Sequence, residues 1–337
     1  MDQKIIPAWL DIPHAIPFDA YMHQVLYHPV YGYYQQASSP LGRDFQTAPM
    51  ISSGLGYALA YSIASAFTQP YDLYELGPGD GHLCLAVLET LKRINHLPQH
   101  VFLHDASPER AQTAAKKIAH IHKAHILSEP PASWSGALIA NEYLDAIPFK
   151  RFSFNGNQHF EHHVVIKNNH LAFDLTPAIS PYNHEFISPR SYEYCSYEPF
   201  LPWLQCGHGT MWLIDYGYDQ NTYLHPDRTS GTMQCFYEGH KHDDPLANPG
   251  RQDITAHVNF SHIAQIVSEH RFLLHGFNSQ GRFMQEVLQT HPHYPYDKQS
   301  LKTLMHPHEM GETIKVLVCG TTSGSILGTS HKIPLRC

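Results

Sequence analysis

The sequence predicts an α/β fold in which a mostly parallel sheet carries helices on both faces. Between residues 71 and 140, short apolar runs of strand length alternate with longer segments that repeat apolar residues at helical spacing. A glycine-rich turn joins the first of these strands to the first helix. The alternation resumes after residue 209, beyond an irregular stretch, and ends in an expected antiparallel hairpin. Such alternation is typical of a parallel sheet with crossover helices.

The first half of the expected core follows from local patterns. The apolar run 71–76 predicts a strand, and Leu83, Val87 and Leu91 recur at helical spacing over 82–94. Ser107 and Pro108 suit the N-cap and first position of a helix over 108–120. The other elements expected here are helices over 19–26 and 55–67 and strands over 101–105, 125–128 and 137–140.

After Pro148 the alternation stops. Residues 150–208 hold short β-like runs such as 160–167, and this stretch predicts an inserted lobe on the substrate side. The stretch 217–256 shows no obvious element, and long irregular loops are usually functional. The other expected elements are strands over 211–215, 272–277 and 315–319 and helices over 258–269 and 282–290, which complete a seven-stranded sheet.

Composition excludes several classes of protein. A net charge of -8 argues against a nucleic-acid duplex as partner, so no nucleic acid is expected. No run approaches the roughly 18 apolar residues of a membrane span, and the N-terminus lacks a signal-peptide pattern. Six cysteines without a Cys-x-x-Cys pair favour a reduced, cytoplasmic protein. The paired histidines (120/122, 240/242, 306/308) are expected to be solvated, so no metal site is predicted.

The turn after the first strand contains three alternate glycines. Glu75 precedes Gly77, Gly79 and Gly81, and glycine is needed where the backbone must approach a ligand closely. A dinucleotide fingerprint would space its glycines as Gly-x-Gly-x-x-Gly, but position 82 is His82. The observed spacing resembles motif I of S-adenosylmethionine-dependent methyltransferases. A carboxylate at the strand end suits that cofactor, whose ammonium and sulfonium groups are both cationic.

Residues after the next two strands complete the expected cofactor site. Asp105 ends the second strand, where a carboxylate accepts hydrogen bonds from both ribose hydroxyls, and Ala106 follows it. Asp105 also suits the start of a helix, where the helix dipole stabilises an acid, and both roles can hold together. Leu127 and Ser128, after the third strand, occupy the usual adenine position.

Acids after the fourth and fifth strands are candidates for catalysis. Asn141 and Glu142 follow the fourth strand, and Asn141 is assigned to the cofactor. Glu142 and Asp145 are three residues apart and would share a face if the segment were helical. With Asp215, at the end of the fifth strand, they would hold an amine-like nucleophile and take up its proton. A capping and ion-pair role for Glu142 and Asp145 stays equally open.

Ordered motifs along nearly the whole chain identify a resemblance to the MidA family, bacterial and mitochondrial S-adenosylmethionine-dependent methyltransferases that include a respiratory complex I assembly factor. The segments 42–52, 75–81, 140–148, 214–218, 242–258 and 280–283 are similar to family motifs. The resemblance implies a Rossmann-like class I methyltransferase core over 71–149 and 209–337, with the lobe 150–208 inserted. It implies that residues 1–70 close the cofactor pocket.

The same resemblance implies a cofactor, a substrate class and further site residues. The cofactor is S-adenosyl-L-methionine, and the implied activity is methylation of protein arginine, with a homologue of a respiratory complex I subunit as a candidate partner. Asp44, Phe45 and Thr47 would line the cofactor pocket. A substrate-facing loop would contain Asp243, Asp244, Asn248 and Asp253.

One departure from the family pattern keeps other functions open. Met50 stands where the family has a glutamate, so one pocket carboxylate is missing. A non-catalytic protein that binds S-adenosylmethionine and holds a partner subunit during assembly is therefore one alternative. A methyltransferase that acts on a small molecule is the other.

Overall fold

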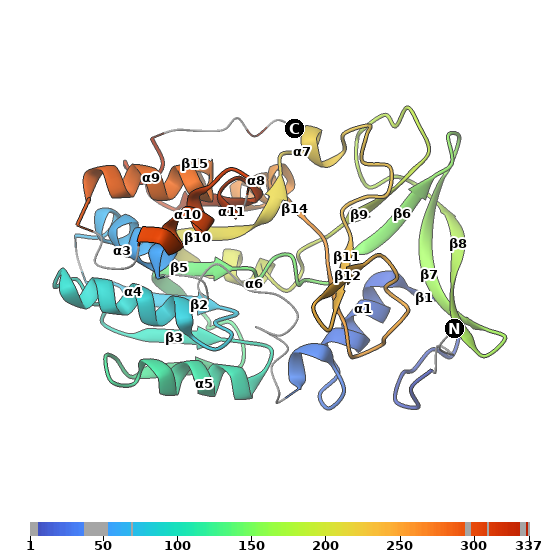
Figure 1. The fold of residues 1–337 in the computed structure, drawn as a ribbon, viewed down its shortest axis with the longest axis horizontal. Helices are drawn as coiled ribbons and strands as arrows, with labels where there is room; N and C mark the ends of the chain where they lie inside the picture. The colour runs from blue at the N-terminus through green and yellow to red at the C-terminus, as the bar shows by residue number, and fades with distance from the viewer. Residues whose placement is uncertain are drawn as a thin grey trace. The chain divides into compact units, whose positions relative to one another are not determined.

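The computed structural model describes residues 6–36, 53–68, 70–293, 298–308, 310–330 and 335. The chain forms two compact units (Figure 1). Unit 1 comprises Met1–Phe45, Asp145–Glu198 and Asn221–His257, and unit 2 comprises Gln46–Leu144, Pro199–Gln220 and Val258–Cys337. The unit that contains the inserted stretch therefore also takes in the N-terminus and most of the irregular stretch 217–256.

Unit 2 is built on a mixed sheet with seven main strands in the order β15-β16-β10-β5-β2-β3-β4. Only β16 runs antiparallel to its neighbours, which confirms the predicted, mostly parallel sheet. The short strand β14 (Val258–Asn259) pairs with β10 beyond this row. The strands are β2 (Asp72–Leu76), β3 (Val101–His104), β4 (Ala124–Leu127), β5 (Trp134–Asn141), β10 (Gly207–Tyr218), β15 (Leu273–Ser279) and β16 (Ile314–Gly320).

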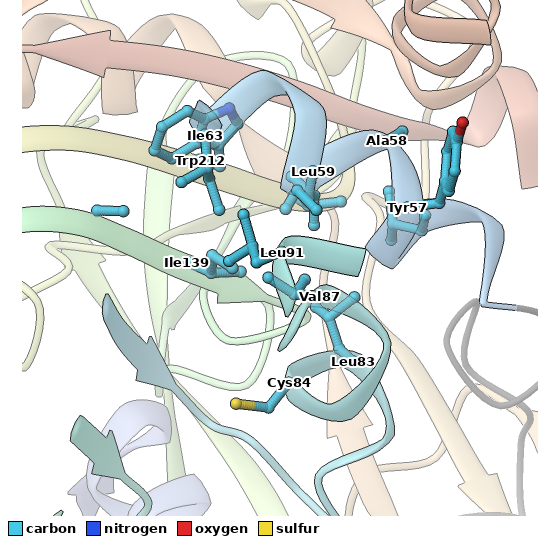
Figure 2. Close-up of a cluster of buried hydrophobic side chains, with 14 of the residues drawn as sticks. Tyr57, Ala58, Leu59, Ile63, Leu83, Cys84, Val87, Leu91, Ile139 and Trp212 are labelled. Atoms are coloured by element: carbon cyan, nitrogen blue, oxygen red, sulfur yellow. The ribbon is translucent and has the colours of Figure 1, made fainter. Parts of the chain in front are cut away.

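The helices that supply most side chains to the large apolar core on one face of this sheet are α3 (Gly54–Ala66), α4 (His82–Arg93), α5 (Pro108–Ile118) and α9 (Gln280–Thr290). Alternate strand residues such as Ile139 and Trp212 face this core, as the period of a strand requires. Figure 2 shows Val87 and Leu91 of α4 near Ile139, with Leu59 of α3 beside them. The short helices α10 (Lys298–Met305) and α11 (Met310–Thr313) lie before β16.

The opposite face is covered differently. Residues 128–133 join β4 to β5 without a helix. The short helix α6 (Leu201–Gln205) brings Trp203 against Tyr74 and Trp134 on this side. The indole Nε1 of Trp134 donates a hydrogen bond of 2.7 Å to the Trp203 carbonyl oxygen. Helix α8 (Phe260–Glu269) packs against β15, where Phe260 contacts Phe277. Large aromatic side chains therefore supply the burial that a crossover helix would otherwise give.

The topology places one crevice at the centre of the sheet. From β2 the chain first moves outward through β3 to β4, and it then crosses to β5 on the other side of β2. Leu76 and Ala140 are paired at the carboxyl ends of these two central strands. Ligands of open α/β sheets bind where the strand order reverses in this way. The loops after β2 and β5 therefore define the candidate site.

Unit 1 contains two antiparallel sheets and one main helix, α1 (Phe18–Tyr27). The buried face of α1, which includes Phe18 and Met22, packs with Val164 and Ile254 in a separate apolar core. The remaining elements of this unit are β1 (Ile16–Pro17), η1 (Tyr33–Gln35), β6 (Lys150–Phe154), β7 (His159–Lys167), β8 (His170–Ala178), β9 (Arg190–Tyr194), β11 (Gln234–Tyr237), β12 (His240–His242) and β13 (Asp253–Thr255).

Two expectations about irregular stretches change with the structure. The stretch 217–256, expected to lack regular elements, contains the helix α7 (Gln220–Tyr223) and a three-stranded sheet in the order β12-β11-β13. Its strands have only three or four residues, too few to show a period in the sequence. In the described part of the chain, no helix is long and apolar enough to cross a membrane.

Candidate active site

The loop after β2 holds three glycines in the left-handed region of backbone space. The φ angles of Gly77, Gly79 and Gly81 are 64°, 54° and 81°. Gly81 is the N-cap of α4, and a Cβ there would lie 2.7 Å from the Cα of Ala114 in α5. Side chains at these positions would be strained and, at Gly81, would also separate α4 from α5. The glycines therefore let the backbone turn tightly at the carboxyl end of β2.

Glu75 lies beneath this loop with its side chain 3% exposed. Its Oε2 has no hydrogen-bond partner among the described residues, while the thiol of Cys84 in α4 donates to the carboxylate. Burial raises the pKa of Glu75 to about 7, and the hydrogen bond from Cys84 opposes part of that rise. A buried acceptor without a partner is costly, and a cationic or hydrogen-donating ligand would satisfy it.

Asp105 follows β3 and is joined to the glycine loop. Its carboxylate accepts a hydrogen bond of 2.8 Å from the Ser107 backbone N–H, and it also accepts from the backbone of Gly79. Burial raises the pKa of Asp105, and these two hydrogen bonds act against the rise. The acid at the second strand end is therefore held beside the glycines of the first. The arrangement supports both roles considered for Asp105, as a ligand acceptor and as an acid at a helix start.

The expected adenine-side residues lie where the second and third strands end. Ala106 is exposed directly after Asp105, and Ser128 is exposed directly after β4. The Leu127 carbonyl oxygen lies 3.0 Å from Nδ1 of His104, the last residue of β3. That contact ties the carboxyl ends of β3 and β4 together and leaves the Ser128 side chain at the surface.

The segment after β5 is held against β10. Glu142 has a φ of 48°, which is uncommon for a residue with a side chain. Its N–H donates to the Ile214 carbonyl oxygen at 2.9 Å, and its Oε1 lies 3.4 Å from Nδ2 of Asn141. The Leu144 N–H donates to Oδ2 of Asp215 at 3.0 Å, and Asp215 is fully buried. Asp215 thus anchors the loop that presents Glu142.

Asp145 belongs to unit 1, and the segment 142–147 is not helical. The argument that Glu142 and Asp145 share a helical face is therefore wrong, because a left-handed residue stands where a helical turn would begin. The Thr255 hydroxyl donates to Oδ2 of Asp145 at 2.9 Å. Burial, together with the charge of Asp253, raises the pKa of Asp145. Asp253 in turn accepts a hydrogen bond of 2.7 Å from the Tyr34 hydroxyl.

The structure brings Glu75, Asp105 and the glycine loop together, and it places Asn141 and Glu142 at the neighbouring strand end. Asp44, Phe45 and Thr47 lie outside the described residues. Sequence reasoning missed two contributors, Cys84 and Tyr143. Their closeness in sequence to predicted site residues could have identified them: Cys84 lies in the first helical turn after the glycines, and Tyr143 directly follows Glu142.

These residues fit S-adenosylmethionine on observations of the chain itself. Gly77 and Gly79 carry no side chain, so the protein backbone of this loop can approach a ligand closely. The unpartnered Oε2 of Glu75 suits an ammonium group, and Asp105 suits a pair of ribose hydroxyls. The cofactor, when bound, supplies a methyl group on a cationic sulfur.

Comparison with known proteins agrees with this fit. Residues 58–278 match a family described as "Putative S-adenosyl-L-methionine-dependent methyltransferase". A Burkholderia thailandensis protein solved with bound S-adenosyl-homocysteine is similar over 94% of this chain and 91% of its own, with a TM-score of 0.83 and 26% sequence identity. A native structure from the same organism, with 26% identity, covers the same shares with a TM-score of 0.84.

Two named relatives are similar to this chain at about the same sequence identity. The Caenorhabditis elegans protein named "Protein arginine methyltransferase NDUFAF7 homolog, mitochondrial" is 25% identical over 85% of this chain and 76% of its own length. Mouse "Protein arginine methyltransferase NDUFAF7, mitochondrial" is 26% identical over 87% of this chain and 78% of its own. The family match spans well over half of the sequence, so this chain belongs to that family of S-adenosyl-L-methionine-dependent methyltransferases.

Proposed function

We propose that this chain methylates a protein side chain and that the acceptor is arginine. The observation that carries the proposal is the position of Glu142 at the end of β5, beside the strand whose loop forms the glycine cradle. The names of the relatives, which call them protein arginine methyltransferases, support the same acceptor. A carboxylate at this place suits a planar cationic guanidinium, which it pairs with through charge-assisted hydrogen bonds.

Methyl transfer requires mainly that the protein hold the acceptor nitrogen in line with the methyl group of the cofactor. As the new N–C bond forms and the S–C bond breaks, sulfur keeps the electron pair and the guanidinium nitrogen must lose a proton. In our proposal Glu142 orients the nitrogen and takes up that proton. Asp215 acts through the loop, because its carboxylate accepts the Leu144 N–H and is fully buried. Asp215 is thus a positioning residue.

Asp145 carries a second part of the proposal. Burial and the charge of Asp253 raise the pKa of Asp145 to about 7, and the hydrogen bond from Thr255 opposes part of that rise. This carboxyl group therefore exchanges a proton near neutral pH more readily than an exposed aspartate. We assign it to the substrate side, together with Asp253 of the same unit. The variant Asp145→Asn is then expected to raise KM for the protein substrate and to leave cofactor affinity unchanged.

The test is transfer of labelled methyl groups from radiolabelled S-adenosylmethionine to proteins of a cell lysate. Wild-type protein should label a discrete band, and acid hydrolysis should recover the label as methylarginine. Glu142→Gln should abolish that band. Glu185→Gln is the matched control, because Glu185 is an exposed glutamate in unit 1. A band that survives Glu142→Gln removes Glu142 from the mechanism.

The two other functions predict different outcomes of the same assay. Label in a low-mass product with an unlabelled proteome would identify a small-molecule methyltransferase. Binding of S-adenosylmethionine without any labelled product, combined with a partner that co-purifies, would indicate an assembly protein. Either result refutes arginine methylation as the activity of this chain.

A further inference from the structure

Tyr143 covers the first glycine of the cradle, although no sequence motif assigns it a role. A Cβ built on Gly77 would lie 3.3 Å from Cδ2 of Tyr143, which is tighter than an ordinary van der Waals contact. The ring also meets Phe200 edge-on, with the ring centroids 6.5 Å apart. Both contacts lie within unit 2. The aromatic ring therefore forms a wall directly against the glycine loop.

The backbone holds this ring in place. The residue before Tyr143 has a left-handed φ of 48°, and its N–H is bonded to Ile214 of β10. The residue after Tyr143 donates its N–H to the buried carboxylate of Asp215. A non-glycine residue in this conformation costs of order 1 kcal/mol or more, and such strain is concentrated at functional sites. Two anchors on one neighbouring strand therefore direct Tyr143 toward Gly77.

The electrostatic surroundings of the ring are acidic. Burial and the nearby charge of Asp105 both raise the pKa of Tyr143, so its phenol stays neutral at physiological pH. Glu75 lies in β2, which leads into the glycine loop, and Asp105 follows β3 and accepts a hydrogen bond from Gly79 of that loop. The face of a neutral aromatic ring carries partial negative charge and attracts cations. An aromatic wall here adds to the preference of the acids for a positively charged ligand.

We propose that Tyr143 is a specificity-determining residue that favours the cationic cofactor over its neutral product. The two ligands share an ammonium group and a ribose, so Glu75 and Asp105 hold both of them. They differ at sulfur, which is a cation in S-adenosylmethionine and an uncharged thioether in S-adenosylhomocysteine. Because the ammonium group is common to both ligands, only the sulfonium lets a ring against the cradle attract S-adenosylmethionine more strongly than the product through cation–π energy. Loss of the methyl group then lowers the affinity of the site for the bound ligand and favours product release.

The experiment is calorimetric titration of the full chain with S-adenosylmethionine and, separately, with S-adenosylhomocysteine. We expect Tyr143→Leu to weaken binding of S-adenosylmethionine about 5- to 30-fold, the range between an exposed and a desolvated cation–π contact. Binding of S-adenosylhomocysteine should change by less than about threefold, since its sulfur carries no charge for the ring to attract. Tyr143→Phe keeps the ring and should preserve the ratio of the two affinities.

Phe102→Leu is the control, because Phe102 is an aromatic residue of the same sheet that stacks on Tyr74 and not on the glycine loop. Circular dichroism of each variant checks that the fold is intact. Equal losses for both ligands, or none for either, would overturn the proposal. Failure of the wild-type chain to bind either ligand would instead contradict cofactor binding itself, so the two failures are distinguishable.

Discussion

Glu75 is predicted to destabilise the folded protein above neutral pH. Its pKa is raised from an ordinary value of 4.5 to about 7 because the carboxylate is buried. Between these two values the folded state binds the proton more tightly than the unfolded state, so stability falls as pH rises and then levels off above about 7. A shift of about 2.5 pKa values, at about 1.4 kcal/mol each, corresponds to roughly 3 kcal/mol.

The perturbation that exposes this cost is Glu75→Gln, which removes the charge and nearly preserves the shape. At pH 8 the variant should gain about 3 kcal/mol over wild type, a rise in melting temperature of about 6–12 °C for a unit of this size. At pH 5 the gain should shrink to about 1 kcal/mol, since most of the titration lies above that pH. The same variant should bind S-adenosylmethionine more weakly, so stability and function change in opposite directions.

The assay is thermal unfolding of the ligand-free protein, followed by circular dichroism at both pH values. Glu185→Gln is the matched control, since its exposed carboxylate should give no pH-dependent gain. An equal shift of melting temperature at pH 5 and pH 8 would refute the reasoning, as would a destabilised variant at pH 8. Either outcome would mean that the Glu75 carboxylate is compensated within the folded chain.

Three further predictions concern the same site. Wild-type affinity for S-adenosylmethionine should rise about tenfold between pH 6 and pH 8, as Glu75 ionises; calorimetry showing a flat profile would contradict its role. Gly81→Ala should cost about 2 kcal/mol or more in denaturant unfolding, because a Cβ would meet the Ala114 backbone at 2.7 Å and φ is 81°; unchanged stability would be unexpected. Asp215→Ala should lower kcat at least about tenfold and change cofactor affinity little, since it frees the Leu144 N–H; steady-state kinetics that show only a raised KM would count against this.

Much of the unit 2 fold was predictable because its signals are local. The helices expected over 82–94 and 108–120 are confirmed: α4 begins at His82, and α5 begins at Pro108 with Ser107 as its N-cap. Strand β10 extends from Gly207 to Tyr218, well beyond the apolar run 211–215 that predicted it. Its polar ends pair with Trp134 and Ser135 of β5 and with Val258 of β14, and a single-sequence pattern does not encode such partners.

The lobe was harder to predict because its unit is assembled from three distant stretches of chain. Helix α1 shares one apolar core with Val164 of β7 and Ile254 of β13. No pattern within any one stretch shows that the three fold together, since residues of all three stretches pack in this one core. The expectation that Glu142 and Asp145 share a helical face failed for a related reason: the backbone turns at Glu142, and the chain passes into the other unit after Leu144.

The sequence by itself determined the strand–glycine turn–helix motif, the alternation of strands and helices, and the acids at the strand ends, because each depends on residues close together in the chain. Only the tertiary structure decided which of those acids are buried, which are already bound to backbone N–H groups, and which aromatic ring lies on Gly77. Burial and hydrogen bonding set the charge state and freedom of a carboxylate, and both arise from strands that are far apart in sequence.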